Sequence, residues 1–503
     1  MERTITASRA EVARRRRRRQ KRNTTIFVTT LIVLVILTVT VIVCVAAFGG
    51  RDLGSETVPK NPAGVNPGEP QGDDAVLPAG DGTDEGENSG DGEADDGTGT
   101  EPQESDSDKI SRLVAEADRL AASYDYDGAI ELIKSYGADY AQKQALTDAI
   151  AGYESTKSTM VRYSDVTTIP HIFFHSLIAD TSRAFDGDYD QDGYNLYMTT
   201  VYEFEHMMEE MYKRGYVLIR IHDMAYEDPE TGEFTAGDIM LPAGKKPFVL
   251  SVDDVNYYDY MTDSNDDHIP DAGGDGFATK IVIGDDGKPT CEYITADGQT
   301  VTGEYDVVPI LDRFVEEHPD FSYRGAKGIL AVTGYEGVFG YRTHPDWKSI
   351  LGEEAWNQAH EDAKAVSQCL KDDGWEIASH SFGHPHYGRM DLDSFKNDVR
   401  KWEEQVEPIV GDTDILIYPF GDDISGVEGY SGPKYDTLME AGFRYYCNVD
   451  SHDAWVQIHD KYMRQGRRNL DGYRLYWNPE MLDDLFDVND VMDPNRPLPV
   501  PSL

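Results

Sequence analysis

Six short apolar runs, separated by stretches with helical periodicity, constrain the fold of this chain more than any other feature. The runs occupy residues 217–221, 248–252, 327–332, 376–380, 415–420 and 445–449. Each is apolar enough to be covered on both faces, which is typical of strands in parallel sheets. Between them lie amphipathic segments, one of which begins with Thr200 and Glu203 at the spacing of a helix capping box. This alternation predicts an α/β domain with a parallel sheet or barrel, whose chemistry lies at the carboxyl ends of the strands.

The amino-terminal segment has the pattern of a membrane anchor. Residues 14–22 read RRRRRRQKR, and residues 26–48 contain no charged side chain. A run of about 23 apolar residues crosses a hydrocarbon core of about 30 Å, whereas the apolar part of a cleaved signal peptide is usually about 7 to 15 residues. The chain is therefore predicted to have a basic cytoplasmic tail (1–23) and a single transmembrane signal anchor (24–48). Because positive charges stay on the inner side, everything after the anchor is expected outside the cell membrane.

Two further segments separate this anchor from the strand-rich region. Residues 49–108 consist largely of Gly, Pro, Asp, Glu and Ser, with little to bury, and are predicted to form a disordered acidic linker. Residues 109–160 change to helical spacing and predict a small helical hairpin. This hairpin is expected to pack on the following domain or to act as a spacer, with partner binding as a third alternative. The strand-rich domain is assigned to residues 161–503.

Composition excludes some classes of function. The formal net charge is −47 over 503 residues, and the one strong cluster of Lys and Arg lies in the amino-terminal tail. A nucleic-acid surface needs such clusters, so no nucleic-acid partner is expected. Cys44 falls in the predicted anchor, which leaves Cys291, Cys369 and Cys447 outside the membrane, so at most one intrachain disulfide can form there.

Polar side chains of unusual chemistry follow two of the apolar runs. Asp253 and Asp254 are adjacent, so their side chains point in different directions, and one can bind a metal while the other faces water. His380 and His384 have the spacing that places two imidazoles on one face of a helical turn, and neutral imidazole is a common zinc ligand. Each pair alone is more typical of a solvated turn or an incidental spacing. Together at one end of a sheet, Asp254, His380 and His384 predict an open metal site.

A third polar segment, YPFG at residues 418–421, follows the run that begins at residue 415. Pro419 ends the strand and Gly421 allows a close turn, which can present a backbone N–H to a developing oxyanion. His386, after Pro385, is interpreted as a substrate-side or surface residue.

In this order, the segments SVDD (251–254), HSFGH (380–384) and YPFG resemble three motifs of the NodB-homology polysaccharide deacetylases, carbohydrate esterase family 4. The form of the third motif is nearest the branch of poly-N-acetylglucosamine deacetylases. Residues 169–177, IPHIFFHSL, resemble the first strand of that family, and the resemblance extends over about residues 165–480. It implies a distorted (β/α) barrel and a metal-dependent N-deacetylase.

The resemblance implies a role for each matched residue. Asp254, His380 and His384 would hold a divalent metal, for which Zn²⁺ is the first choice and cobalt or another divalent ion the alternative. Asp253 would be the general base that takes a proton from the attacking water. The oxyanion would be stabilised by the metal and by a backbone N–H near Tyr418 and Phe420.

Two residues of the family pattern are not in their usual places. YPFG lacks the third-motif arginine that braces the base, and the candidates to replace it are Arg464, Arg467 and Arg468, of which Arg468 is our choice. The late Leu-x-His general acid is also missing. His459 is the candidate in its place, although His459 and the nearby His452 are both typical of surface histidines.

The remaining histidines near the matched segments, His171 and His175, are interpreted as packing and hydrogen-bonding residues of the first strand. The segment 257–305 is an insertion rich in Asp, Gly and Asn. It is expected to lie over the same end of the barrel as the metal, where it shapes the substrate groove or acts as a lid.

The sequence therefore favours a membrane-anchored extracellular enzyme that removes N-acetyl groups from an aminosugar polysaccharide, either peptidoglycan or poly-N-acetylglucosamine. Two alternatives stay open: a catalytically weak or inactive carbohydrate-binding module on the same fold, and an O-deacetylase of acetylated polysaccharide. The presence of Asp253 and of all three candidate metal ligands favours an enzyme.

Overall fold

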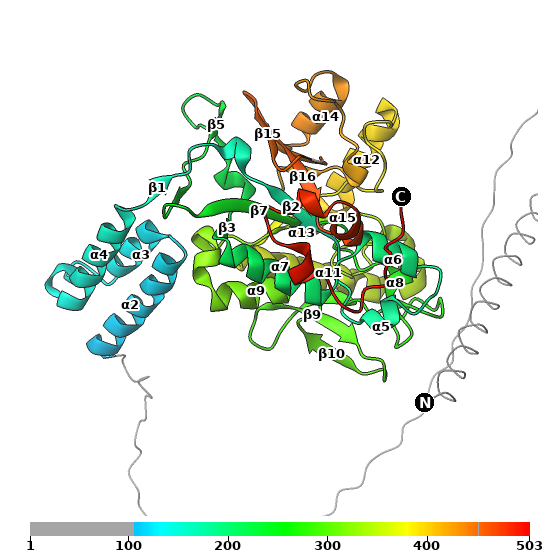
Figure 1. The fold of residues 1–503 in the computed structure, drawn as a ribbon, viewed down its shortest axis with the longest axis horizontal. Coiled ribbons are helices and arrows are strands. Elements are labelled where there is room, and N and C mark those ends of the chain that lie inside the picture. The colour runs from blue at the N-terminus through cyan, green and yellow to red at the C-terminus, as the bar shows by residue number, and fades with distance from the viewer. Residues whose placement is uncertain (1–104, 451) are drawn as a thin grey trace, which may run out of the picture. The chain divides into compact units, whose positions relative to one another are not determined.

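Seven parallel strands pair edge to edge until the last meets the first, which closes a barrel (Figure 1). The computed structural model describes residues 105–450 and 452–503. In order around the barrel, the strands are β2 (His171–Phe174), β7 (Lys246–Val252), β11 (Ile329–Val332), β12 (Glu376–Ser379), β13 (Ile415–Ile417), β14 (Tyr445–Val449) and β16 (Met463–Asn469). β3 (Tyr216–Leu218) pairs with the start of β7, and β15 (Trp455–Ile458) lies antiparallel to β16. The predicted α/β barrel is confirmed.

Helices connect the strands and cover the outside of the barrel. They are α5 (Thr181–Ala184), α6 (Gln191–Tyr197), α7 (Val201–Lys213), α9 (Val307–Glu317), α10 (Lys348–Leu351), α11 (Glu353–Asp372), α12 (Leu392–Gln405), α13 (Glu407–Val410), α14 (Pro433–Glu440), α15 (Gly472–Trp477) and α16 (Val488–Val491). The capping box predicted for α7 is present, since Thr200 Oγ accepts a hydrogen bond from the Glu203 N–H and the Glu203 carboxylate accepts one from the Thr200 N–H.

The largest hydrophobic core lies between one side of the barrel and the helices α7, α9 and α11. Leu250 and Leu330 on the strands pack in the same cluster as Phe204 and Met211 of α7 and Leu370 of α11, and all are almost completely buried. Each such side chain contributes roughly 1.5–3 kcal/mol on burial. This packing fixes β7, β11 and β12 relative to one another and thereby positions the residues at their carboxyl ends.

The segment predicted as a helical hairpin forms three helices, α2 (Asp106–Ala122), α3 (Tyr126–Lys134) and α4 (Gln144–Lys157). The helix begins two residues before the predicted end of the linker, because Ser105 caps α2 through its side chain. The three helices pack against the domain that follows. The Tyr124 hydroxyl donates to the Asp320 carbonyl over 2.8 Å, and the Arg324 N–H donates to the Ser123 carbonyl over 2.7 Å.

No helix among residues 105–450 and 452–503 is long and apolar enough to cross a bilayer. The predicted cytoplasmic tail, the anchor at 24–48 and the linker up to residue 104 lie outside the residues that the structure describes.

The insertion at 257–305 divides into two parts. Its first residues form the short helix α8 (Asp259–Thr262) close to the metal-site residues. The rest forms an antiparallel sheet of β8 (Lys280–Ile283), β9 (Pro289–Ile294) and β10 (Thr300–Gly303), which packs against α9 and α11. The insertion as a whole was expected over the mouth of the barrel, but its sheet covers these outer helices instead, because Ile281, Cys291 and other apolar side chains join their core.

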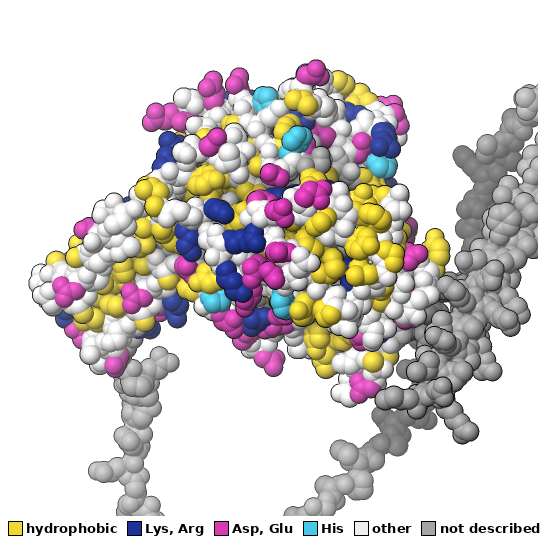
Figure 2. Space-filling model, in the orientation of Figure 1, with side chains coloured by type: hydrophobic (Ala, Val, Ile, Leu, Met, Phe, Trp, Pro, Cys, Tyr) yellow, Lys and Arg dark blue, Asp and Glu magenta, His cyan; other side chains and the backbone are white. Residues whose placement is uncertain are grey.

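Two further pairs of short strands lie outside the barrel: β1 (Val161–Arg162) with β6 (Met240–Leu241), and β4 (Ala225–Glu227) with β5 (Phe234–Ala236). The three cysteines in the described part of the chain, Cys291, Cys369 and Cys447, are all free thiols. Acidic side chains are spread over the face shown in Figure 2, with Lys and Arg interspersed among them.

Candidate active site

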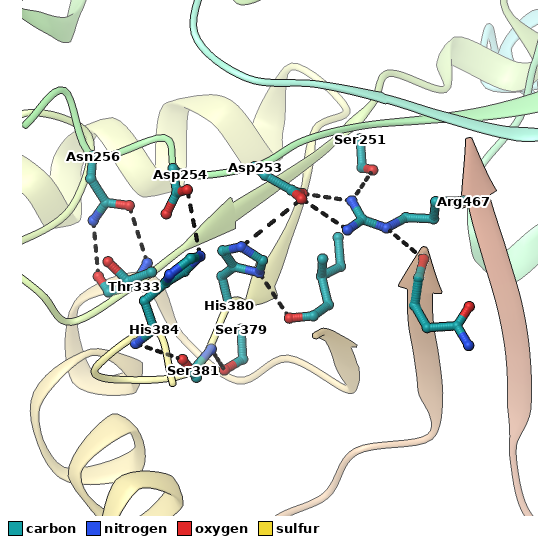
Figure 3. Close-up of polar contacts among 12 residues, drawn as sticks. Ser251, Asp253, Asp254, Asn256, Thr333, Ser379, His380, Ser381, His384 and Arg467 are labelled. Carbon is teal, nitrogen blue, oxygen red and sulfur yellow. Dashed lines mark hydrogen bonds and ion pairs between the residues drawn. The ribbon is translucent and has the colours of Figure 1, made fainter. Parts of the chain in front are cut away.

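The structure brings together the three residues that the sequence predicted as metal ligands (Figure 3). Asp254 follows β7, and His380 and His384 follow β12. All three therefore lie at the carboxyl end of the barrel, after two strands that are separated in the ring by β11. One ligand atom from each lies within 4.8 Å of the others. Asp254 Oδ2 lies 3.6 Å from His384 Nε2.

This donor set fits a divalent cation of the zinc type. A tetrahedral ion with bonds of about 2.0–2.2 Å has ligand atoms about 3.3–3.6 Å apart, close to the Asp254–His384 separation. His380 Nδ1 donates a hydrogen bond to the Ile417 carbonyl over 2.8 Å, so its Nε2 carries the free lone pair. Burial lowers the pKa of His384, with His380 acting in the same direction against the charge of Asp254, which favours the neutral imidazole that a metal requires.

The two histidines lie on an irregular loop and not on the helical turn that their spacing suggested. Ser381 and His384 both have positive φ angles, 65° and 52°, which a helix does not allow. The Ser381 hydroxyl accepts a hydrogen bond from the His384 N–H over 3.0 Å. The Asp398 carboxylate accepts two more, from the Phe382 and Gly383 N–H groups. These bonds hold an otherwise strained loop in the shape that turns both imidazoles toward Asp254.

Asp253 points away from Asp254 and is held by an arginine. Arg467 donates from its two terminal nitrogens to Asp253 Oδ1 and Oδ2 over 2.6 and 2.8 Å, and both side chains are buried. Burial alone would raise the pKa of Asp253, but the charges of Arg467 and His380 hold it well below its usual range. Asp253 Oδ2 lies 3.9 Å from His380 Nε2, so the ionised carboxylate is beside the metal ligands without being one of them.

The choice of Arg468 as the brace is wrong. Successive side chains of β16 point to opposite faces of the sheet. The Arg467 side chain therefore points into the barrel, and the Arg468 side chain points out of it. Arg468 binds the Asp484 carboxylate over 2.7 and 3.0 Å. The third candidate, Arg464, binds Asp423 over 2.7 Å.

Beneath Asp253, the barrel interior contains a chain of polar side chains that includes His171, which is a buried hydrogen-bonding residue as predicted. Arg467 also donates to Ser251 Oγ over 3.1 Å, Ser251 Oγ lies 2.9 Å from His171 Nε2, and His171 Nδ1 lies 3.2 Å from Gln465 Oε1. Burial lowers the pKa of His171 strongly, and the charge of Arg467 acts in the same direction. A neutral His171 therefore completes a network that fixes the arginine and, through it, the carboxylate of Asp253.

His175, interpreted from sequence as a packing residue, lies at the site. It follows the carboxyl end of β2, the neighbour of β7, and is partly exposed. Its charge acts on Asp253 and on His384. Burial raises the pKa of Asp471, and the charge of His175 partly offsets this effect. His175 thus lies at the carboxyl end of β2, next in the ring to the strand that Asp253 and Asp254 follow.

The structure does not bring His459 to the metal ligands. His459 follows β15, which is outside the closed ring. Its Nε2 lies 3.1 Å from Gln457 Oε1, and its ring stacks on Tyr462 with centroids 4.6 Å apart. The expectation that His459 replaces the missing general acid is therefore wrong. His452, the alternative, pairs with Asp450.

Tyr418 and Phe420 differ from each other in what they can contribute. The Tyr418 N–H donates to the Cys447 carbonyl over 2.9 Å, so it is engaged in the sheet and is not directed at a substrate. Phe420 is 61% exposed, and its ring lies against His384 and His386. Its ring centroid is 4.5 Å from that of His384 and 4.1 Å from that of His386, which it stacks upon. Phe420 therefore forms a wall of the site.

A second aromatic wall lies on the Asp254 side. The rings of Tyr260 and Tyr335, 52% and 54% exposed, lie beside the buried Tyr258, with centroids 6.0 and 5.8 Å from it. The Tyr258 hydroxyl in turn contacts Asp254. Exposed aromatic rings thus flank the metal ligands on both sides.

The fold and the site together define a closed parallel barrel with a candidate metal centre at the carboxyl ends of its strands. No protein-family model matches the chain, and no curated protein matches it. Solved structures do. The deacetylase PplD of Streptococcus pyogenes, in complex with acetate, is 12% identical over 67% of this chain and 100% of its own, with a TM-score of 0.33. A polysaccharide deacetylase from Bacillus cereus is 11% identical over 65% of this chain and 69% of its own, with a TM-score of 0.32.

The sequence identities and TM-scores of these solved structures are low, so we base the functional assignment on the geometry of the site.

Proposed function

We propose that this chain is a metal-dependent deacetylase that hydrolyses N-acetyl groups of an aminosugar polysaccharide. One observation carries the proposal. Asp253, an ionised carboxylate braced by Arg467, lies beside Asp254, His380 and His384 but is not one of the predicted ligands. A metal site and a separate, oriented carboxylate are the two parts that metal-assisted hydrolysis of an acyl group uses.

A divalent cation held by Asp254, His380 and His384 would polarise the acetyl carbonyl and lower the pKa of water, and Zn²⁺ suits this donor set. Asp253 accepts the proton of the attacking water. Arg467 binds both carboxylate oxygens, which keeps the base in one orientation. The base therefore needs no reorientation when the substrate arrives.

The amine that leaves the acetyl group must gain a proton, and we assign this step to His175. It lies at the end of the strand next to β7, is partly exposed and is near enough to Asp253 for their charges to interact. Histidine is the side chain that most often acts as a general acid or base in enzymes. His175 would take the role for which the sequence offered His459.

The aromatic walls support a carbohydrate substrate. Tyr260 and Tyr335 on one side and Phe420 on the other expose ring faces that can stack on the apolar faces of sugar rings. Peptidoglycan and poly-N-acetylglucosamine both carry acetylated amines on such rings. The apolar segment 24–48 and the acidic linker would hold the enzyme outside the cell membrane, within reach of either polymer.

The alternative of an inactive binding module rested on two missing groups, the brace and the general acid. Arg467 and His175 occupy positions suited to both roles, which weakens that alternative. No specific observation favours an O-acetyl over an N-acetyl substrate, so ester hydrolysis is an outcome of the test below.

The test is acetate release by the full-length protein in detergent, with metal content measured on the same sample. Chitooligosaccharides, peptidoglycan and acetylated xylan are the substrates, each with chelator and with chelator followed by Zn²⁺. We expect about one equivalent of metal and chelator-sensitive acetate from an N-acetylated substrate, with the Asp253→Asn protein as the inactive control. Acetate from xylan alone would make the protein an O-deacetylase. Bound metal with no acetate would favour the binding module, and no metal binding would refute the proposal.

A further inference from the structure

The Tyr258 hydroxyl donates a hydrogen bond to Asp254 Oδ1 over 2.6 Å. The other oxygen of the same carboxylate, Oδ2, is the one that faces His384. Tyr258 is the residue immediately before α8, at the start of the insertion, and was not singled out by the sequence. The two oxygens of Asp254 therefore have different partners.

We propose that Tyr258 is a positioning residue that restricts Asp254 to binding the metal through one oxygen. This inference rests on the proposed metal site. A carboxylate can bind a cation through one or both oxygens, and a strong hydrogen bond to one of them favours the single-oxygen mode. The ion then keeps positions open for water and for the substrate carbonyl, as a catalytic site requires.

The phenol is itself fixed by its surroundings. Tyr258 is only 9% exposed, and its hydroxyl also lies 3.3 Å from Thr333 Oγ1 at the end of β11. Thr333 is tied to the same turn by two reciprocal hydrogen bonds (Figure 3), because Asn256 Nδ2 donates to its carbonyl and its N–H donates to Asn256 Oδ1. The chain between Asp254 and Tyr258 is thus clamped to the neighbouring strand.

The backbone supports the same conclusion. Asp254 has a φ angle of 55°, which is costly for an aspartate and persists only where the surroundings hold it. The hydrogen bond from Tyr258 joins a side chain four residues along to that strained residue and fixes the rotation of its carboxylate. Without it, Oδ1 would be free to turn toward the cation.

The experiment compares the wild-type full-length protein with Tyr258→Phe. Zn²⁺ affinity is measured by competition with a chromophoric chelator, and coordination by the visible absorption of the Co²⁺-substituted protein. We expect Tyr258→Phe to bind Zn²⁺ about 10- to 100-fold more weakly, as loss of a hydrogen bond to a metal ligand typically does. The Co²⁺ bands should weaken, because a second carboxylate oxygen raises the coordination number.

Tyr260→Phe is the matched control. It removes a phenol hydroxyl two residues away, from a ring that stacks on Tyr258 and has no hydrogen bond to Asp254 among the contacts of the described residues. Its Zn²⁺ affinity and Co²⁺ spectrum should equal those of the wild type. Unchanged affinity and spectrum in Tyr258→Phe would overturn the inference while the proposed function stands. If His384→Ala binds Zn²⁺ as tightly as the wild type, the metal site is elsewhere and both proposals fail.

Discussion

Arg467 binds both carboxylate oxygens of Asp253 from a position 214 residues further along the chain. The two side chains are buried together, so neither charge has water to replace its partner. Loss of one member of such a pair typically destabilises a protein by about 3–5 kcal/mol. The pair therefore joins the first half of the barrel to the last strand and also orients the proposed base.

Replacement of Arg467 by Lys should lower kcat by about 10- to 100-fold without loss of metal. Lys keeps the charge but cannot bind both oxygens at once, and a hydrogen bond to a charged group is worth about 1.5–3 kcal/mol. Steady-state kinetics and metal analysis on the same sample measure this. Arg468→Lys is the control, because its partner is Asp484, and it should keep normal kcat. If Arg468→Lys lost activity instead, Arg467 would not be the brace.

Replacement of the proposed base and replacement of a proposed metal ligand should have different effects on metal binding. Asp253→Asn keeps the size of the side chain, so we expect normal Zn²⁺ content and a fall in kcat of about 10²- to 10⁴-fold. His384→Ala removes a ligand and should abolish metal binding and activity together. Metal analysis and acetate release show the difference. Loss of metal in Asp253→Asn would mean that Asp253 is a ligand.

His175→Gln should reveal the general acid through the choice of leaving group. An amine must be protonated to leave, whereas 4-nitrophenolate leaves without help. We expect kcat on an N-acetylated oligosaccharide to fall about 10²- to 10⁴-fold, while hydrolysis of 4-nitrophenyl acetate and the Zn²⁺ content stay near wild type. His459→Gln should leave both reactions unchanged. Equal losses on the two substrates would argue that His175 does not supply the proton.

Replacement of His386 should weaken substrate binding without changing metal binding. Its ring stacks on Phe420, which forms the exposed wall beside His384. An aromatic contact of this kind is worth about 0.5–1.5 kcal/mol, so His386→Ala should raise KM about 3- to 10-fold with little change in kcat. Zn²⁺ affinity should not change. A His386→Ala protein without metal would contradict the proposed ligand set.

At the other end of the barrel, His222 should make stability depend on pH. It lies between Glu376 and Asp414; burial alone would lower the pKa of His222, but its hydrogen bonds to Asp414 and Glu376 outweigh this effect and raise the pKa to about 10. An unfolded histidine has a pKa of about 6.5. The stabilisation is therefore complete below about pH 6.5 and is lost as the pH rises toward 10.

Denaturant unfolding of the wild type and of His222→Gln at pH 6, 8 and 10 tests this prediction. The difference in unfolding free energy between the two proteins should be largest at pH 6 and smallest at pH 10. Because the His222 side chain is partly exposed, solvent reduces the size of the effect. A constant difference across this range would show that the two carboxylates do not hold a charged imidazole.

The runs of apolar residues predicted most strands of the barrel, because most of these strands are buried on both faces. β16 was missed for a physical reason. It reads MRQGRRN, and six of its seven residues are buried. Arg464, Arg467 and Arg468 are all buried and pair with carboxylates outside β16, and a hydropathy pattern does not show such pairs.

The three candidate metal ligands could be predicted because they lie in segments that follow apolar strands and because the order of these segments resembles a known family. The brace and the acid could not. Arg467 and Arg468 are identical neighbours in sequence, and only the register of β16 decides which enters the barrel. His175 lies in the segment 169–177 that resembles the family's first strand, but the resemblance gave it no catalytic role, and only the closed ring of strands places it at the site and leaves His459 outside. Which arginine and which histidine reach the site depends on contacts between residues far apart in the sequence, such as His171 and Gln465, which are 294 positions apart.

The pairing of β2 with β16, the first and last strands of the ring, has a consequence for any attempt to shorten this protein. The three matched motifs lie between residues 251 and 421, but the arginine proposed to brace the base is on β16 and the histidine proposed to protonate the amine directly follows β2, and these two strands pair with each other. A fragment built around the motifs would keep the candidate ligands Asp254, His380 and His384. It would lose Arg467, which orients the proposed base, and His175, which we propose as the proton donor to the amine. We therefore expect the proposed activity to need the whole ring of strands.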